Sequence, residues 1–75
     1  MDIEKLCMMF TMQEPYYGIL LSSMQRRERP GLNTLAVGKS GNVFVLYYDK
    51  QYIESLPIDT ALAALKHEVN MYSLR

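Results

Sequence analysis

The stretch that most constrains the fold is Val43–Tyr48, in which every residue is β-branched, aromatic or leucine. Such side chains favour extended backbone, so the stretch predicts a β-strand. Both alternating sets of side chains are apolar, and the strand is therefore expected to be covered on both faces. A second strand is predicted at Thr34–Val37, and the glycine-containing segment Gly38–Asn42 between the two strands predicts an antiparallel hairpin.

Two helices are predicted before this hairpin. Asp2 can cap the first, which runs to about Met12 with apolar residues at helical spacing. Pro15 suits the first turn of a second helix, whose apolar stripe reaches Met24. The polar segment Arg26–Gly31 predicts the C-terminal end of this second helix, closing in a turn, because the helix dipole favours cationic side chains there.

Two further helical segments are predicted after the hairpin. Asp49 can cap a short helical turn that ends at Pro57, and Asp59 can cap a final helix over residues 60–73. The predicted fold class is therefore α+β, with three main helices packed on a two-stranded antiparallel β-hairpin. A chain of 75 residues has room for a single domain, 1–75, with a small core.

The charged residues favour no class of charged partner. Eight Lys and Arg residues balance eight Asp and Glu residues, so no net field attracts nucleic acid or an anionic membrane. Arg26, Arg27 and Arg29 could contact phosphates, but the zero net charge disfavours nucleic-acid binding. No stretch approaches the ~20 apolar residues that span a bilayer, and no signal peptide is recognisable.

The single cysteine, Cys7, cannot form an internal disulfide and fits a reducing compartment. We therefore expect a cytoplasmic protein. Cys7 lies within the apolar stripe of the first helix, and the sequence places no basic partner beside it that would activate a thiol. It is predicted to be a small buried hydrophobic residue.

Three methionines, Met8, Met9 and Met12, widen the apolar stripe of the first helix beyond what a surface helix needs. One interpretation is core packing by adaptable side chains. The other is a partner-binding surface, because methionine adapts well to the shape of another protein. The sequence leaves both interpretations open.

The final helix is apolar on two sides. One stripe consists of Leu62, Leu65, Val69 and Tyr72, and Ala64, His67, Met71 and Leu74 gather on the roughly opposite side. A helix of this kind is either enclosed by its own chain or covered by another molecule. The predicted partner-binding residues are Met8, Met9, Met12, His67, Met71 and Leu74.

The same helix carries His67-Glu68-x-x-Met71, which has the spacing of the zinc-protease motif H-E-x-x-H. In that motif two histidines one helical turn apart bind zinc, and the glutamate acts as a general base on the metal-bound water. Here Met71 stands in place of the second histidine, and a thioether suits copper(I) rather than a hydrolytic zinc. Catalytic zinc normally has three protein ligands, and His67 is the only histidine in the chain.

These features resemble the N-terminal part of a family of zincin-like metallopeptidases found in bacteria and phages. The resemblance rests on Pro15-Tyr16-Tyr17-Gly18, on Tyr47-Tyr48 followed by Tyr52-Ile53, and on the helix with His67-Glu68. It implies that His67 is the counterpart of a zinc ligand and Glu68 of the general base. The chain departs from the family at Met71, and it ends at Arg75, before a third ligand would appear.

From the residues and the resemblance together we expect a non-catalytic protein that binds another protein. It would be a degenerate zincin-like half-domain of phage origin that acts on a host protein, with no metal and no cofactor. Glu68 and His67 are vestigial candidates for a base and a ligand. The alternative is a fragment or remnant of a zinc-dependent metallopeptidase whose missing ligands lie outside this chain.

A homodimer is also expected. The apolar residues exceed what 75 residues can readily hide, and symmetric self-association is the commonest way to cover such a surface. The hairpin edge or the methionine-rich first helix is expected at its centre.

Overall fold

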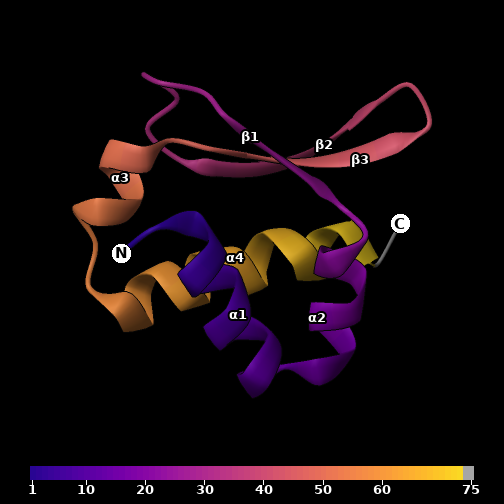
Figure 1. Ribbon diagram of the computed structural model, residues 1–75, viewed down its shortest axis with the longest axis horizontal. Helices are drawn as coiled ribbons and strands as arrows, with labels where there is room; N and C mark the ends of the chain where they lie inside the picture. Colours follow the sequence, from indigo (N-terminus) through magenta and orange to yellow (C-terminus); the bar gives the residue numbers. More distant parts are fainter. Residues whose placement is uncertain (74–75) are drawn as a thin grey trace.

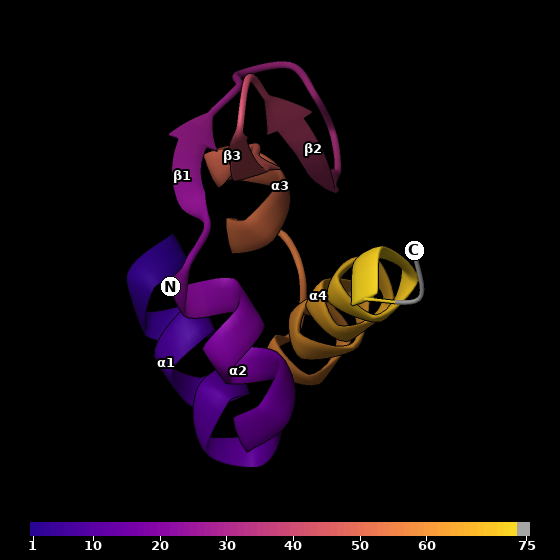
Figure 2. The same cartoon turned by 90° about the vertical axis from the view of Figure 1, so that its right-hand side faces the viewer.

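A three-stranded sheet forms one layer of the computed structural model, and helices pack on one face of that sheet (Figures 1 and 2). The structure describes residues 1–73. No helix within this range is both long enough and apolar enough to cross a membrane. The elements in chain order are α1 (Ile3–Gln13), α2 (Pro15–Ser22), β1 (Gln25–Glu28), β2 (Leu35–Ser40), β3 (Val43–Tyr48), α3 (Lys50–Glu54) and α4 (Ile58–Ser73).

The class is α+β, but the prediction of a two-stranded antiparallel hairpin is wrong, because β1 adds a third strand. β1 lies parallel to β3 and β2 lies antiparallel to it, so the strand order is β1-β3-β2. The segment that we predicted as the end of the second helix supplies β1, because α2 already ends at Ser22. Gln25–Glu28 contains no β-branched or aromatic residue, so propensity gives no sign of a strand. Its backbone becomes extended because it pairs with the open edge of β3.

The β2–β3 hairpin is present, but β2 spans Leu35–Ser40 and not the predicted Thr34–Val37. β3 spans Val43–Tyr48 as predicted, whereas β2 continues to Ser40, beyond the predicted end at Val37. The turn is therefore only Gly41 and Asn42. Gly41 has a φ of 63°, which glycine adopts without strain, and a glycine in this position matches the twist of hairpin strands.

Two of the three predicted helix caps are confirmed. The Asp2 side chain accepts a hydrogen bond from the Lys5 backbone N–H at 2.7 Å and caps α1, and Asp49 caps α3. The prediction that Asp59 caps the final helix is wrong. α4 begins at Ile58, so Asp59 lies in its first turn, where the helix dipole also favours a negative charge.

The core lies between the sheet and the helices. The apolar stripe predicted for α1 is confirmed, since Ile3, Leu6, Cys7 and Phe10 are all buried. The outer face of the sheet has no helix over it (Figure 2), so the predicted cover on both faces of β3 is present only in part. On that face Val43 is 38% exposed, and the Arg29 guanidinium lies 4.8 Å from the centre of the Tyr47 ring.

Asp49 ties the loop between β1 and β2 to the start of α3. Its carboxylate is buried and accepts hydrogen bonds from the backbone N–H groups of Asn33, at 2.9 Å, and Gln51, at 3.1 Å. The hydrogen bond from Asn33 is the main reason that the pKa of Asp49 is lowered below its usual value.

Replacing Asp49 by asparagine is expected to remove a pH-dependent part of the stability. Because folding lowers the pKa of Asp49, the carboxylate stabilises the fold at every pH above its unfolded value of ~3.9. That contribution is lost as the pH falls through the lower folded-state pKa. Thermal midpoints of the wild type and Asp49→Asn should differ most near neutral pH and converge as the pH falls below the usual carboxyl range. Glu54→Gln, at an exposed position of the same helix, is the control. A constant difference at all pH values would contradict the prediction.

Candidate protein-binding site

The motif residues of α4 lie at its surface. His67 is exposed and Met71 is 46% exposed, both on the side of the helix away from the buried stripe of Leu62, Leu65 and Val69. Glu68 is half-buried. Leu74, which we also predicted as a partner-binding residue, lies outside the described residues.

Of the three methionines of α1, one packs against the core and two lie at the surface. Met9 is half-buried and packs against the core. Met8 and Met12 are 59% and 77% exposed, one helical turn apart on the solvent side of α1. Because α1 packs against α4 through its buried stripe, these two methionines and the His67–Met71 pair face away from each other. The structure therefore does not combine all the predicted residues into one site.

No group of three or more His, Cys, Asp and Glu side chains within residues 1–73 could hold a metal ion. The motif spacing is present on α4, with Met71 one helical turn from His67 where the second histidine would stand.

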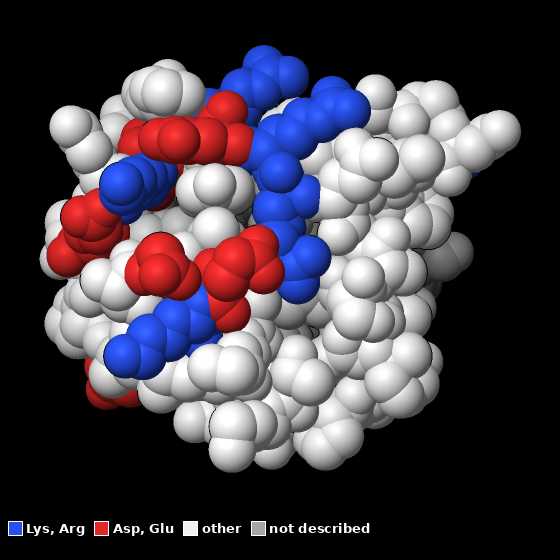
Figure 3. Space-filling model, viewed as in Figure 1, with Lys and Arg blue, Asp and Glu red and all other residues white. Residues whose placement is uncertain are grey.

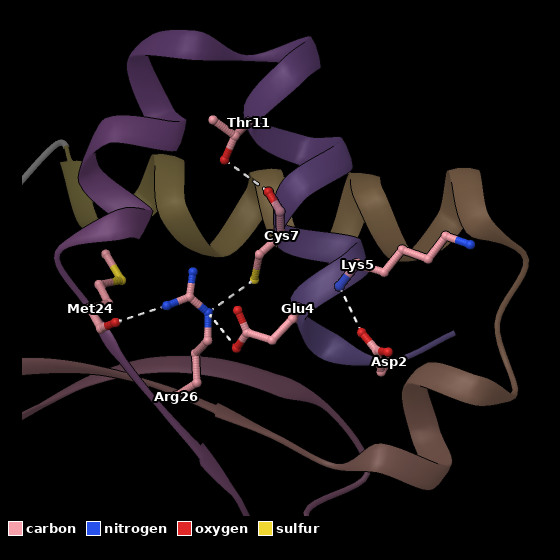
Figure 4. Close-up of polar contacts among 7 residues, drawn as sticks. All are labelled: Asp2, Glu4, Lys5, Cys7, Thr11, Met24 and Arg26. Carbon is pink, nitrogen blue, oxygen red and sulfur yellow. Dashed lines mark hydrogen bonds and ion pairs between the residues drawn. The ribbon is translucent and has the colours of Figure 1, made fainter.

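Cys7 is part of a polar contact between β1 and α1 (Figure 4). Arg26 points from β1 toward the helices, with its Nε 3.4 Å from the Cys7 Sγ and 3.2 Å from a carboxylate oxygen of Glu4. Its Nη1 donates to the Met24 carbonyl at 3.2 Å. Burial raises the pKa of the Cys7 thiol, even though Arg26 opposes this change. The group therefore holds β1 on α1 and does not produce a reactive thiolate.

The three arginines do not form a common phosphate site. Arg26 is turned inward, Arg27 donates to the Gln25 side chain at 3.1 Å, and Arg29 lies over Tyr47. The prediction that they mark a helix C-terminus is wrong, since Arg26 and Arg27 belong to β1. On the face shown in Figure 3, acidic side chains lie next to the basic ones.

A second part of that face carries no charge. Figure 3 shows an uncharged area over α2 and the C-terminal half of α1, in the lower and right parts of the view. Glu14 is the only charged residue between Lys5 and Arg26, and its carboxylate lies 2.7 Å from the Lys66 Nζ. The exposed apolar residues of these two helices are Met8, Met12, Tyr16 and Ile19, and we call them the uncharged face.

An apolar groove adjoins this face on the other side of α2. It has a volume of about 310 Å³ and lies between α2, α4 and the β2–β3 hairpin. Its lining residues are Leu20, Met24, Phe44, Val69, Tyr72 and Ser73. No charged side chain is among them. A volume near the lower end of the range for ligand pockets suits one or two bulky apolar side chains.

The walls of the groove are held in place by contacts between the elements. The rings of Phe44 and Tyr72 meet edge-to-face, with centroids 4.6 Å apart, and join the hairpin to α4. The Tyr17 hydroxyl donates to the Asn70 side chain at 2.7 Å and joins α2 to α4. The groove is therefore formed before any partner binds, which reduces the ordering cost of binding.

Sequence reasoning missed this groove, because its residues were assigned to the stripes of separate helices and to a strand. One signal was available. α2 has apolar residues on every side, and a helix of that kind has to be covered all round. In the structure its Tyr16 and Ile19 are 67% and 70% exposed.

No known protein family, curated protein or solved structure matches this chain.

Proposed function

We propose that this protein is a non-catalytic interaction protein, and that it binds an apolar segment of another protein in the groove between α2, α4 and the hairpin. The observation that carries the proposal is the position of α2. This helix is apolar on all sides, lines the groove with Leu20 and exposes Tyr16 and Ile19 beside it.

The chemistry of the groove supports a peptide segment over other ligands. A nucleic acid or an acidic ligand would need cations, and none of the lining residues within 1–73 supplies one. A cofactor needs several convergent polar groups to fix its orientation, and the lining offers only the side chains of Tyr72 and Ser73. The partner segment should therefore present one or two bulky aliphatic or aromatic side chains and no charge at the contact.

In this proposal the chain descends from a zincin-like protein but does not keep its activity. His67 and Met71 lie at the surface, which supports the proposal that this helix has lost its role in metal chemistry. The Met71 thioether is then an adaptable contact for a partner protein. A phage origin and a host partner remain part of the same proposal. In the alternative, a fragment or remnant of a zinc-dependent metallopeptidase, the other zinc ligands would come from outside this chain and lie next to His67.

A groove-filling substitution tests the proposal. Ser73 lies at the rim of the groove and is exposed, so Ser73→Trp can place a ring in the groove without disturbing the core. Peptides selected from a random library on the wild type should lose at least tenfold in affinity for Ser73→Trp. Ser73→Ala, the matched control, should bind them as the wild type does.

Two further readouts separate binding from folding. The thermal midpoint of Ser73→Trp should equal or exceed that of the wild type, because the new ring buries apolar surface. Backbone amide shifts on peptide addition should change around Leu20, Phe44 and Val69. Selected peptides that bind Ser73→Trp and the wild type equally would overturn the proposal, and so would failure to select any peptide.

A further inference from the structure

The two edges of the sheet differ in how well they are protected from pairing with another strand. β1 is four residues long, and three of them, Arg26, Arg27 and Glu28, are charged, which is a common protection of an edge. β2 is six residues long, pairs with β3 along its whole length and carries a single charge, Lys39. A regular edge with so little charge is open to a further strand.

The hairpin register shows which backbone groups of β2 point outward. Ser40 and Val43 flank the two-residue turn and form a hydrogen-bonded pair, so Gly38 and Ala36 also bond to β3. Leu35, Val37 and Lys39 then direct their backbone N–H and C=O groups away from β3. Within residues 1–73 no hydrogen bond engages the outward backbone groups of Val37 and Lys39.

We infer that a second copy of this chain occupies this edge, with two β2 strands paired antiparallel across a two-fold axis at Val37. This register pairs Val37 with its own copy and Leu35 with Lys39 of the other chain, so all three outward-facing residues are bonded. It also keeps the two Lys39 side chains apart. Moving the axis to Lys39 would place like charges directly opposite each other, which is destabilising.

α4 supports the choice of a second copy. Figure 2 shows β2 and α4 on the same side of the molecule, away from α1 and α2. The side of α4 that faces away from the core bears Met71, which is 46% exposed. Two-fold pairing of β2 would bring these two α4 surfaces together beneath a continuous six-stranded sheet.

The area required for a stable dimer explains why α4 is needed. A standard interface buries about 800 Å² on each partner. That is roughly one-sixth of the 4798 Å² surface of this chain. A single edge strand of six residues is too narrow to provide it, so the adjoining surface of α4 has to contribute. The inference does not depend on the proposed groove, which adjoins α2.

Disulfide trapping tests the register. In a Cys7→Ala background, Val37→Cys places two thiols in a hydrogen-bonded pair with Cα atoms ~5.5 Å apart, within the range that a disulfide spans. Oxidation should convert most of this protein to a covalent dimer. The control, Lys39→Cys in the same background, should cross-link at least tenfold more slowly, because its thiol lies opposite Leu35.

Mass and pairing in solution give an independent readout. Light scattering of the wild type should give twice 8.7 kDa at micromolar concentrations. Lys39→Pro removes an outward N–H while leaving the bonds to β3 intact, and it should raise the dissociation constant at least tenfold with the fold retained. A monomeric mass at millimolar concentration would overturn the inference and leave the edge to another protein. Faster cross-linking at residue 39 than at residue 37 would also overturn it.

Discussion

Phe10→Ala is expected to lower the free energy of unfolding by about 3–5 kcal/mol. Phe10 is 1% exposed, is among the largest fully buried side chains and belongs to the core cluster. A domain of 75 residues has a stability of about 4–11 kcal/mol in total. The cavity left by the ring therefore removes a large part of it, and urea unfolding followed by circular dichroism would measure the loss.

The control for this prediction is Met12→Ala on the same helix. Met12 is 77% exposed, so its truncation should change the free energy of unfolding by no more than about 0.5 kcal/mol. If a partner or a second copy covers Met12 in solution, the loss will be larger and will depend on protein concentration. Equal losses for Phe10→Ala and Met12→Ala would show that α1 does not pack as described.

Gly18→Ala is expected to destabilise the protein by about 1–3 kcal/mol, although alanine is normally the better helix former. A Cβ at Gly18 would lie 2.5 Å from the Thr11 Cγ2 and 2.8 Å from the Thr11 Cα. The Cγ2 could move, but the Cα belongs to the backbone of α1. The two helices would therefore have to separate, and Leu21 beside the contact would lose packing.

Two variants check this explanation by urea unfolding. Ser22→Ala changes an exposed residue of α2 and should be nearly neutral. Thr11→Ala combined with Gly18→Ala removes the contact with Cγ2 and leaves that with Cα, so it should recover only part of the loss. A Gly18→Ala variant more stable than the wild type would contradict the close approach of α1 and α2.

Local signals in the sequence were sufficient for most elements. The apolar stripe Ile3, Leu6, Cys7 and Phe10 follows the period of a helix, and all four residues are buried. Val43–Tyr48 is a strand with the predicted ends, because β-branched and aromatic side chains restrict the backbone locally. Capping carboxylates at Asp2 and Asp49 set two helix starts, since they satisfy N–H groups that the helix leaves unpaired.

The candidate site was much less predictable. For Met8 and Met12 the sequence left core packing and surface exposure both open, and the structure shows that they are exposed. The groove could not be predicted, because it combines Leu20, Phe44 and Tyr72 from three different elements. Periodicity shows which residues share a face of one element, but it does not show which faces meet. The spacing of His67 and Met71 was correct for one helix face, yet the position of that face relative to the other elements required the packed structure.

The sequence by itself determined the α+β class and those helices and strands whose own side chains favour a helical or extended backbone. Only the tertiary structure decided that Gln25–Glu28 is a strand, that this strand is parallel to β3, and that Arg26 faces Cys7 and Glu4. The physical reason is that a polar segment without strand propensity becomes extended only when another strand offers unpaired N–H and C=O groups. That edge belongs to β3, whose residues lie twenty positions after the β1 residues with which they pair, and no local pattern in β1 indicates the pairing.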